Sequence, residues 1–213
     1  MKKVLLLIGA LLMMHTASAQ FGWGFFGGPQ LSNVCGDEAE SWEGLITLHV
    51  GLMGNLAISD DINFQPEIVF SRQGADYSET YEGFEEISYS GTVNIDYLNI
   101  PLIFQYEVAD GLTLEAGPQV GFVLSAKDNF EGGGESGEED VKDLVKSTAF
   151  GANIGAGYTF DNGIRVAARY NLGLTEINDD DSFGEGVSWK NHVVQVSLGY
   201  YIKFDKIKGE SQD

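Results

Sequence analysis

The chain has 213 residues, a formal net charge of −20, 28 glycines and a 43% share of hydrophobic residues. This length suits one domain with one core, and the glycine and aromatic content with few prolines indicates a folded, β-rich chain. Phosphate repels a chain of this charge, so nucleic acid is excluded as a partner.

Residues 1–19 have the features of a secretory signal peptide. Two lysines precede an apolar run at residues 4–14, and Ala17, Ser18 and Ala19 supply the small side chains that a signal peptidase accepts. We therefore expect cleavage between Ala19 and Gln20. The apolar run is too short to be an anchor, and no later segment approaches the ~20 apolar residues of a transmembrane helix. A membrane location would therefore require strands.

From Gln20 onward, segments of alternating apolar and polar or small residues are separated by connectors that are alternately long and short. In the clearest segment, residues 112–125, Leu112 and Leu114 share one face while Thr113 and Glu115 share the other. This period of two is typical of a β-strand. The eight predicted strands are residues 21–32, 45–58, 62–71, 97–107, 112–125, 150–160, 164–175 and 194–204.

The connectors indicate how these strands are arranged. The short ones, at 59–61, 109–111 and 161–163, carry the Asp, Asn and Gly that tight hairpins need. An even strand count puts both termini on one side, so we expect the long connectors to be acidic loops on the outer face. The long connectors are residues 35–43, 74–90, 127–146 and 177–190. The pattern predicts an all-β, eight-stranded antiparallel up-and-down transmembrane β-barrel.

We expect this barrel to span residues 20–205, followed by a charged tail at 206–213. Alternation alone would also suit a soluble, lipocalin-like barrel. However, Gly, Asn, Gln, Thr and Ser dominate the non-apolar face, whereas a solvent-facing surface is rich in charges. Aromatic residues near segment ends suit interfacial girdles. They are Phe21, Trp23, Phe64, Phe70, Tyr106, Phe160 and Phe204. We therefore expect apolar side chains to face lipid.

The charged residues on the predicted lumen face include a candidate polar cluster of Glu67, Glu115, Arg165 and Arg169. A charge in so narrow a space must be paired or hydrated to offset its desolvation, so we expect these carboxylates to face these guanidinium groups. A structural plug is the favoured interpretation, and a proton or ion relay is the alternative. An eight-stranded barrel is only just wide enough for its own side chains, which disfavours a wide pore.

Two further motifs could suggest a ligand site or a catalytic site. Gly22, Gly24 and Gly27 spell G-x-G-x-x-G, but no strand precedes them and no helix follows, so we interpret them as packing residues. His49 and His192 are candidate general bases of a lipid-modifying hydrolase, but neither lies near a recognisable nucleophile motif. A structural role is favoured for both.

The acidic run at 179–181, with Glu176 and Glu185, offers oxygen ligands for a cation such as calcium, but its spacing matches no dedicated loop. Solvated loops, or loose divalent bridging to lipopolysaccharide, are favoured instead. Cys35 is the only cysteine, so we expect an inert loop thiol, with an intermolecular bridge as the alternative. No catalytic, cofactor or metal site is predicted.

Several segments together resemble a known family. They are Tyr-Leu-Asn-Ile-Pro-Leu at 97–102, Leu-Glu-Ala-Gly-Pro-Gln-Val-Gly at 114–121, and the stretches at 150–158 and 168–174. These segments resemble the PorT-like outer membrane β-barrel proteins of Bacteroidetes-type bacteria, over essentially the whole mature chain. The resemblance implies an eight-stranded outer-membrane barrel. It implies less about activity, although one namesake of the family takes part in protein secretion across the outer membrane. The charged tail after Phe204 departs from outer-membrane barrels that end on the aromatic residue.

The leading hypothesis is a non-enzymatic, monomeric protein of the bacterial outer membrane whose acidic loops serve surface interaction or envelope structure. Outer-membrane lipid and lipopolysaccharide are the expected partners, and a protein partner is left open. The alternatives are a narrow channel or secretion component, a lipid-modifying enzyme, and a soluble carrier.

Overall fold

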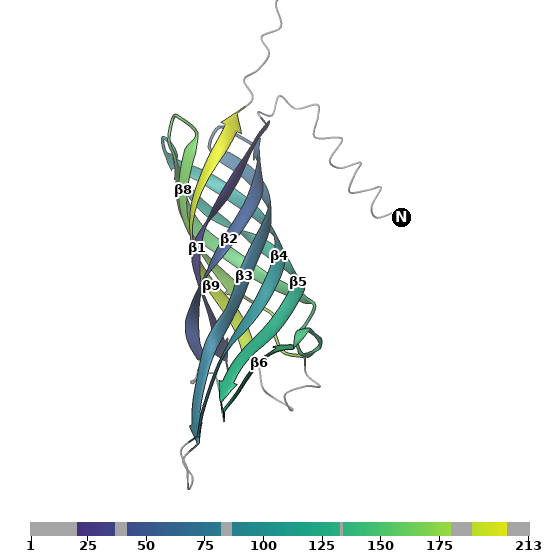
Figure 1. Cartoon of the computed structure of the whole chain (residues 1–213). Coiled ribbons are helices and arrows are strands. Elements are labelled where there is room, and N and C mark those ends of the chain that lie inside the picture. Colours follow the sequence, from purple (N-terminus) through teal and green to yellow (C-terminus); the bar gives the residue numbers. More distant parts are fainter. Residues whose placement is uncertain (1–20, 37–41, 82–86, 133, 180–188, 204–213) are drawn as a thin grey trace, which may run out of the picture.

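The computed structural model describes residues 21–36, 42–81, 87–132, 134–179 and 189–203. The predicted signal peptide with its cleavage site at Ala19 and Gln20, Phe204 and the tail at 206–213 lie outside these residues. The described part contains nine strands (Figure 1). They are β1 (Phe21–Gly36), β2 (Trp42–Ala57), β3 (Ile62–Tyr81), β4 (Ile87–Ala109), β5 (Leu112–Gly132), β6 (Glu135–Asp140), β7 (Thr148–Thr159), β8 (Ile164–Gly173) and β9 (Trp189–Lys203).

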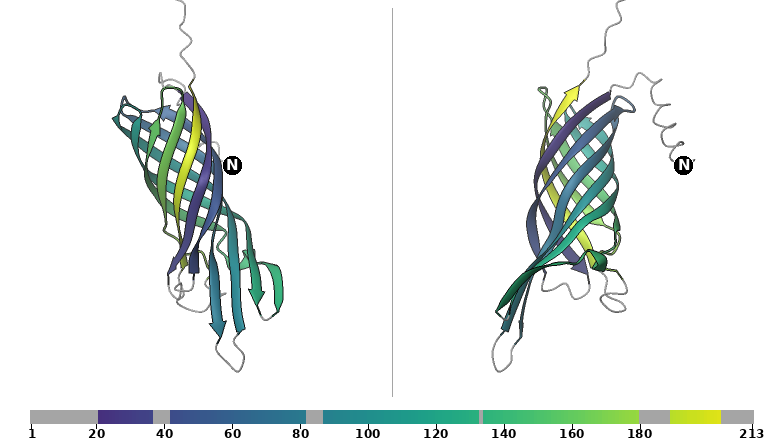
Figure 2. Two further views of the ribbon diagram at one scale, coloured as in Figure 1. Left: turned by 60° about the vertical axis from the view of Figure 1, so that its left-hand side comes forward. Right: turned by 45° about the vertical axis from the view of Figure 1, so that its right-hand side comes forward.

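Eight of the strands form a closed antiparallel ring, as predicted. Each ring strand pairs with its neighbours in sequence, and β1 pairs with β9 to close the barrel (Figures 1 and 2). Closure leaves the ring itself without a free edge. The ninth strand, β6, pairs with β5 and lies outside the ring.

No helix in the described parts of the chain is long and apolar enough to cross a membrane.

The two faces of the ring strands have opposite chemistry. On β5, Leu112 and Leu114 are 38% and 52% exposed, whereas Thr113 and Glu115 between and after them are buried. The same alternation exposes four of the predicted girdle aromatics. They are Trp23, Phe70, Tyr106 and Phe160. Apolar residues therefore cover the outward face and most lumen positions are polar, which confirms the predicted orientation. An exception is a buried apolar cluster in the lumen, made of Phe26, Met53, Val69 and Tyr201.

The short connectors form tight turns at one end of the barrel. Gly111 and Gly163 have φ angles of 73° and 87°, in the left-handed region that glycine adopts without strain. At the remaining short turn, the amide of Ile58 donates to the carbonyl of Ile62 over 2.8 Å. The start of β1 and the end of β9 lie at this same end of the barrel (Figure 1). We call the opposite end the outer end.

Two of the predicted loops are largely strand, so the boundaries predicted at 74–90 and 127–146 are wrong. β3 continues to Tyr81, β4 begins at Ile87, and β5 runs to Gly132 before β6 returns alongside it. The strands project beyond the ring, as Figure 2 shows. Backbone pairing continues there although the apolar alternation has ended, because interstrand hydrogen bonds do not depend on a lipid-facing side.

We call this projection the outer extension and define it as residues 72–81, 87–96 and 125–132 together with β6. The border between the ring and the outer extension is marked by a change on the outward face of β3. Apolar Phe70 is followed there by Arg72, which pairs with Asp96 of β4 over 2.7 Å. Cys35 was expected in a loop, but it lies in strand β1. It pairs with Lys190 of β9 next to the last residue pair of the two strands, and its side chain is exposed.

The apolar side chains reverse direction at the outer end. A buried apolar cluster, which we call the outer cluster, fills the space that the strands enclose at this end. Its members are Val34, Ala75, Ile95, Tyr97, Val123, Ala126 and Ile177. Outside the lipid, water lies on the outward face, so burying apolar side chains requires that they point inward.

Candidate functional site

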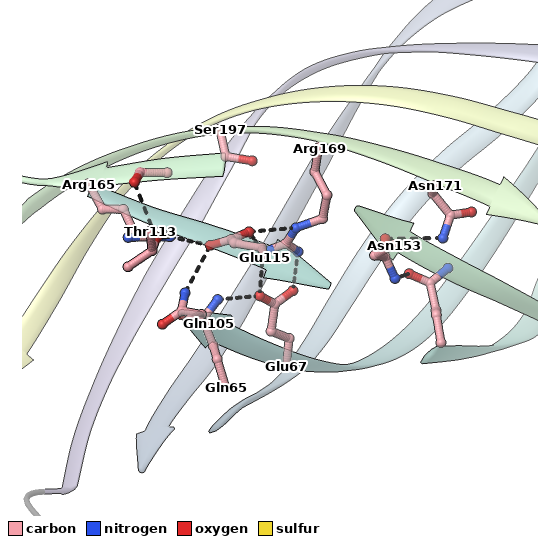
Figure 3. Close-up of polar contacts among 12 residues, drawn as sticks. Gln65, Glu67, Gln105, Thr113, Glu115, Asn153, Arg165, Arg169, Asn171 and Ser197 are labelled. Carbon is pink, nitrogen blue, oxygen red and sulfur yellow. Dashed lines mark hydrogen bonds and ion pairs between the residues drawn. The ribbon is translucent and has the colours of Figure 1, made fainter. Parts of the chain in front are cut away.

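The four predicted lumen charges meet across the barrel. The Arg169 guanidinium grips Glu67 at 2.8 and 3.0 Å and Glu115 at 2.7 and 3.0 Å (Figure 3). Arg165 Nη2 also pairs with Glu115. Because β3, β5 and β8 are not ring neighbours of one another, these contacts cross the lumen. We call the four residues the ion cluster.

Glycines on β7 make room for both arginines. A Cβ atom at Gly157 would lie 2.2 Å from Arg165 Nη2, and one at Gly155 would lie 3.1 Å from Arg169 Cγ. Because alternate residues of a strand face the lumen, Arg165 and Arg169 on β8 lie beside Gly157 and Gly155 of β7, which have no side chain. At this level of the barrel, the long side chains of β8 therefore lie over glycines of β7.

Uncharged side chains satisfy the remaining hydrogen-bonding capacity of the ion cluster. Gln105 Nε2 donates to Glu115 Oε1 over 2.9 Å and to Gln65 Oε1 over 2.8 Å (Figure 3). Arg165 Nη2 donates to the Thr113 hydroxyl over 2.9 Å. The two carboxylates and two guanidinium groups balance in charge, and each of the four side chains is at most 8% exposed. Buried charges arranged in this way are paired and hydrogen-bonded, as their desolvation requires.

A layer of amides fills the lumen between the ion cluster and the outer cluster. Gln195 Nε2 donates to Gln30 Oε1 over 2.9 Å, and Gln30 Nε2 donates to the Ser71 hydroxyl over 2.9 Å. Asn171 and Asn153 are joined at 3.1 Å. The cavities lined by the ion cluster and by this amide layer are about 10 and 30 Å³. Spaces of this size hold a water molecule rather than a solute.

His49 faces the lumen and meets a serine that the sequence analysis did not pair with it. Its Nε2 lies 2.8 Å from the Ser197 hydroxyl, although the two residues are 148 positions apart on β2 and β9. No local signal could have found this contact. Among the described residues, His49 Nδ1 has no hydrogen-bond partner, so the acidic residue that orients a catalytic histidine is not in place. The pair also faces away from lipid.

The remaining predicted sites do not assemble with the ion cluster. His192 lies on the outward side beside the Tyr170 hydroxyl. Of the predicted calcium ligands, Glu176 pairs with Lys146 Nζ at 3.0 Å, while Asp180, Asp181 and Glu185 lie outside the described residues. Within the described residues, no three acidic, histidine or cysteine side chains gather as a metal site would require.

The glycines of the G-x-G-x-x-G motif all lie within β1. A Cβ atom at Gly24 would lie 2.4 Å from the Tyr200 carbonyl oxygen, and one at Gly27 would lie 2.9 Å from that of His49. The motif therefore marks close approach between barrel strands, as the packing interpretation predicted.

Comparison with known proteins identifies the family. Residues 15–179 match the family described as the outer membrane protein beta-barrel domain, and no curated protein sequence matches the chain. Among solved structures, the chain is similar to Ail, the attachment invasion locus protein of Yersinia pestis, with 13% identity and a TM-score of 0.48 over 86% of this chain and 99% of that one. It is also similar to Neisserial surface protein A, with 11% identity and a TM-score of 0.41 over 88% of this chain and 100% of that one.

A similarity of the same order links the chain to the outer membrane protease OmpT from Escherichia coli, with 11% identity and a TM-score of 0.41 over 90% of this chain and 100% of that one. The family match covers most of the sequence and agrees with the closed, lipid-facing ring of strands. The chain therefore belongs to the outer membrane protein β-barrel domain family and is a β-barrel protein of the bacterial outer membrane.

Proposed function

We propose that the chain is a non-enzymatic, monomeric protein whose filled barrel anchors an acidic outer extension at the cell surface for surface interaction or envelope structure. The observation that carries this proposal is the bridge from Arg169 to Glu67 and Glu115 across the lumen. A barrel that is filled in this way leaves its outer end as the surface on which partners can bind.

The ion cluster supports an anchoring role over a transport role. Opening a path along the lumen would require separating Arg169 from both carboxylates, and a buried charge without its partner costs about 3–5 kcal/mol. The amide layer would have to part as well, since Gln195, Gln30 and Ser71 form a continuous chain of hydrogen bonds.

The outer extension supplies the surface for interaction. Four of the six residues of β6 are acidic and all six are exposed. A groove of about 600 Å³ between the extension and the start of β2 is lined by Glu43, Asp76 and Glu131 among polar, small and two aromatic side chains. This charge suits a basic protein surface, or lipopolysaccharide phosphates bridged by divalent cations. Membership of the PorT-like group, on the segments described above, is part of the same proposal.

The alternatives have less support. A narrow channel or secretion component would need the ion cluster to open or to relay protons. A lipid-modifying enzyme would need its histidine and serine at the lipid boundary, whereas the contact between His49 and Ser197 lies in the lumen.

Single-channel recording in planar bilayers tests the filled barrel. The wild-type protein should give no stable conductance steps, while Arg169→Ser, which removes the bridge, should give brief openings. The matched control is Arg72→Ser, which changes the same charge at the surface and should stay silent. Steady ohmic steps from the wild-type protein would contradict the proposal and favour the channel.

Cys35 provides a test of orientation in intact cells. It is the only cysteine in the sequence, and it is exposed at the outer end of β1. A membrane-impermeant maleimide should label it without permeabilisation. Labelling that requires permeabilised cells would place the outer extension on the periplasmic side.

Charge neutralisation tests surface interaction. The variant Glu135→Gln, Glu138→Gln, Asp140→Asn removes three exposed carboxylates from β6. The control Asp60→Asn, Asp61→Asn, Asp110→Asn removes three exposed carboxylates at the opposite end. Species cross-linked to the wild-type protein on cells should be lost from the first variant and kept by the second. Equal cross-linking by both variants would contradict an acidic interaction surface.

A further inference from the structure

A second, more enclosed pocket of about 370 Å³ lies at the outer end, on the inner side of the outer extension. Three aromatic side chains from three different strands line it, namely Trp42, Tyr77 and Trp189, together with two carboxylates, Asp128 and Glu139. Its floor is formed by members of the outer cluster. The volume falls within the range of small-molecule pockets, about 300–1,000 Å³. We call it the mouth pocket.

Irregular strand pairing places two of these side chains in the pocket. Between Gly44 and His49, β2 carries one more residue than the facing stretch of β3, and Trp42 lies beyond this shift. On β5, Ser125 pairs with Asp96 while Val123 pairs with Tyr97, so Leu124 is the extra residue. The extra residue reverses the inward and outward positions, and Asp128 therefore points inward.

The aromatic side chains form a connected wall. The ring centre of Trp42 lies 5.7 Å from that of Tyr77 and 5.4 Å from that of Trp189, with tilted planes. The Tyr77 hydroxyl donates to Asp128 over 3.0 Å, which links the wall to the carboxylate side. Aromatic faces with a carboxylate beside them attract cations.

The two carboxylates face each other without a counter-charge. Asp128 pairs directly with Glu139 across β5 and β6, so both side chains lie on one face, an arrangement that destabilises a sheet. On the other face of the same two strands, Lys127 pairs with Glu138. Throughout the described residues, neither Asp128 nor Glu139 forms an ion pair.

The local electrostatics agree with this geometry. Burial raises the pKa of Asp128, and the Glu139 carboxylate adds to the rise, although the hydrogen bond from Tyr77 opposes it. A cation bound between the two carboxylates would relieve the repulsion that the sheet now holds. An anion would meet two negative charges and is disfavoured.

We propose that the mouth pocket binds a small organic cation, an ammonium group carrying an apolar body. The ammonium group lies between Asp128 and Glu139 and against the aromatic wall, and the apolar body rests on the outer cluster. This inference goes beyond the proposed function, which concerns the exposed face of β6 and the filled barrel. The carboxylates neutralised in the surface test above are not those of the mouth pocket, so the two proposals fail separately.

Tryptophan fluorescence of the full-length protein in detergent gives a direct measurement. The sequence has three tryptophans, so Trp23→Phe leaves Trp42 and Trp189 as the only reporters, both in the pocket. The probes are phenethylammonium, its neutral analogue phenethyl alcohol, and the anion 3-phenylpropionate. We expect saturable binding of phenethylammonium, about tenfold tighter than the alcohol, and no saturation with the anion.

Charge-removing variants sharpen the measurement. Asp128→Asn and Glu139→Gln keep the shape of each side chain and should each weaken phenethylammonium binding by about tenfold. Asp61→Asn, an equal charge change at the opposite end, should leave binding unchanged. Glu139 is exposed on β6, so its variant should fold even if Asp128→Asn does not.

Three results would overturn the proposal. They are equal affinity for the alcohol and the ammonium probe, unchanged affinity in Glu139→Gln, and no saturation of the fluorescence change at millimolar phenethylammonium. The first would indicate an apolar pocket without charge selection, and the others would show that the two carboxylates do not form a cation site.

Discussion

Strands β3, β4 and β5 run through both the barrel and the outer extension, but their apolar side chains face opposite ways in the two regions. Along β4, Phe104 points outward and is 50% exposed while Gln105 faces the lumen and is buried. Ten residues earlier on the same strand, Ile95 is buried on the inside and Asp96 pairs with Arg72 outside. The same alternate positions of β4 point inward in both regions, so the medium outside the strand decides which face is apolar.

The ion pairs of the two regions also differ in their exposure to water. Arg169 is almost fully buried and holds two carboxylates, whereas the Arg72 side chain is 52% exposed and holds one. Water screens the second pair and not the first. Substitutions in the barrel should therefore have large effects and those in the outer extension small ones.

The largest effect is expected for Arg169→Met. Removing this guanidinium leaves Glu67 without its charge partner in a buried site, so we expect a loss of about 3–5 kcal/mol in the free energy of unfolding. Urea unfolding in lipid vesicles, followed by tryptophan fluorescence, measures it. Combining the change with Glu67→Gln should recover part of the loss, because Glu115 keeps Arg165 as its charge partner. An Arg169→Met variant as stable as the wild type would show that the lumen admits enough water to hydrate Glu67.

Gly157→Val should have the next largest effect. The new Cβ atom would meet the Arg165 guanidinium, and overpacking of this kind costs about 1–3 kcal/mol. Gly22→Val is the matched control, because its Cβ atom would have its nearest neighbour at 3.5 Å, an ordinary contact. Equal losses in the two variants would mean that strand propensity, and not the space under Arg165, accounts for the glycine.

A smaller effect is expected from pH in the outer extension. The pKa of Asp128 is raised above its ordinary value of 3.8, chiefly by burial, so the folded state binds this proton more tightly than the unfolded state. The contribution of Asp128 to stability is therefore greatest below 3.8 and is lost as the pH rises through the raised pKa.

Amide hydrogen exchange of β5 and β6, compared between wild-type protein and Asp128→Asn across this pH range, isolates the contribution of the one carboxylate. The difference between the two proteins should grow as the pH rises, with the wild type exchanging faster at neutral pH. A difference that shrinks as the pH rises would show that ionised Asp128 stabilises the outer extension. Strands β7 and β8 serve as the internal reference, because they belong to the ring and Asp128 lies in the outer extension.

The smallest effect is expected for Arg72→Ala. An exposed ion pair contributes about 0–1 kcal/mol, and Asp96 can be hydrated once its partner is removed. The same urea measurement applies, and the result should be within error at high salt. A loss as large as that of Arg169→Met would erase the distinction between the two regions.

The sequence alone predicts the part of the fold that lipid enforces. Alternation of the kind seen in Leu112, Thr113, Leu114 and Glu115 persists wherever one face meets lipid and the other meets a polar lumen, so all eight ring strands were predicted. The same alternation predicted that the four members of the ion cluster face the lumen. Their pairing was also predictable, because a buried charge must be paired and a narrow lumen brings few opposite charges within reach.

Beyond the lipid this constraint disappears, and the prediction fails with it. The strand pairing of residues 72–78 with 90–96 carries charged and polar side chains on its outward face, which in a sequence look like a loop. The extra residues in β2 and β5 reverse the inward and outward positions without a sequence signal. Contacts such as that between His49 and Ser197 depend on the closure of the ring and cannot be found from local pattern.

The position of β6 has a consequence for neighbouring copies in a crowded membrane. Within the described sheet, β6 pairs with β5 on one side, and its other side has no strand partner. An open strand offers backbone donors and acceptors to any passing chain of similar shape. The β6 strand of a second copy would bring its own glutamates and aspartate against those of the first. This repulsion should keep adjacent barrels from pairing edge to edge, while the backbone of β6 stays accessible to an oppositely charged segment.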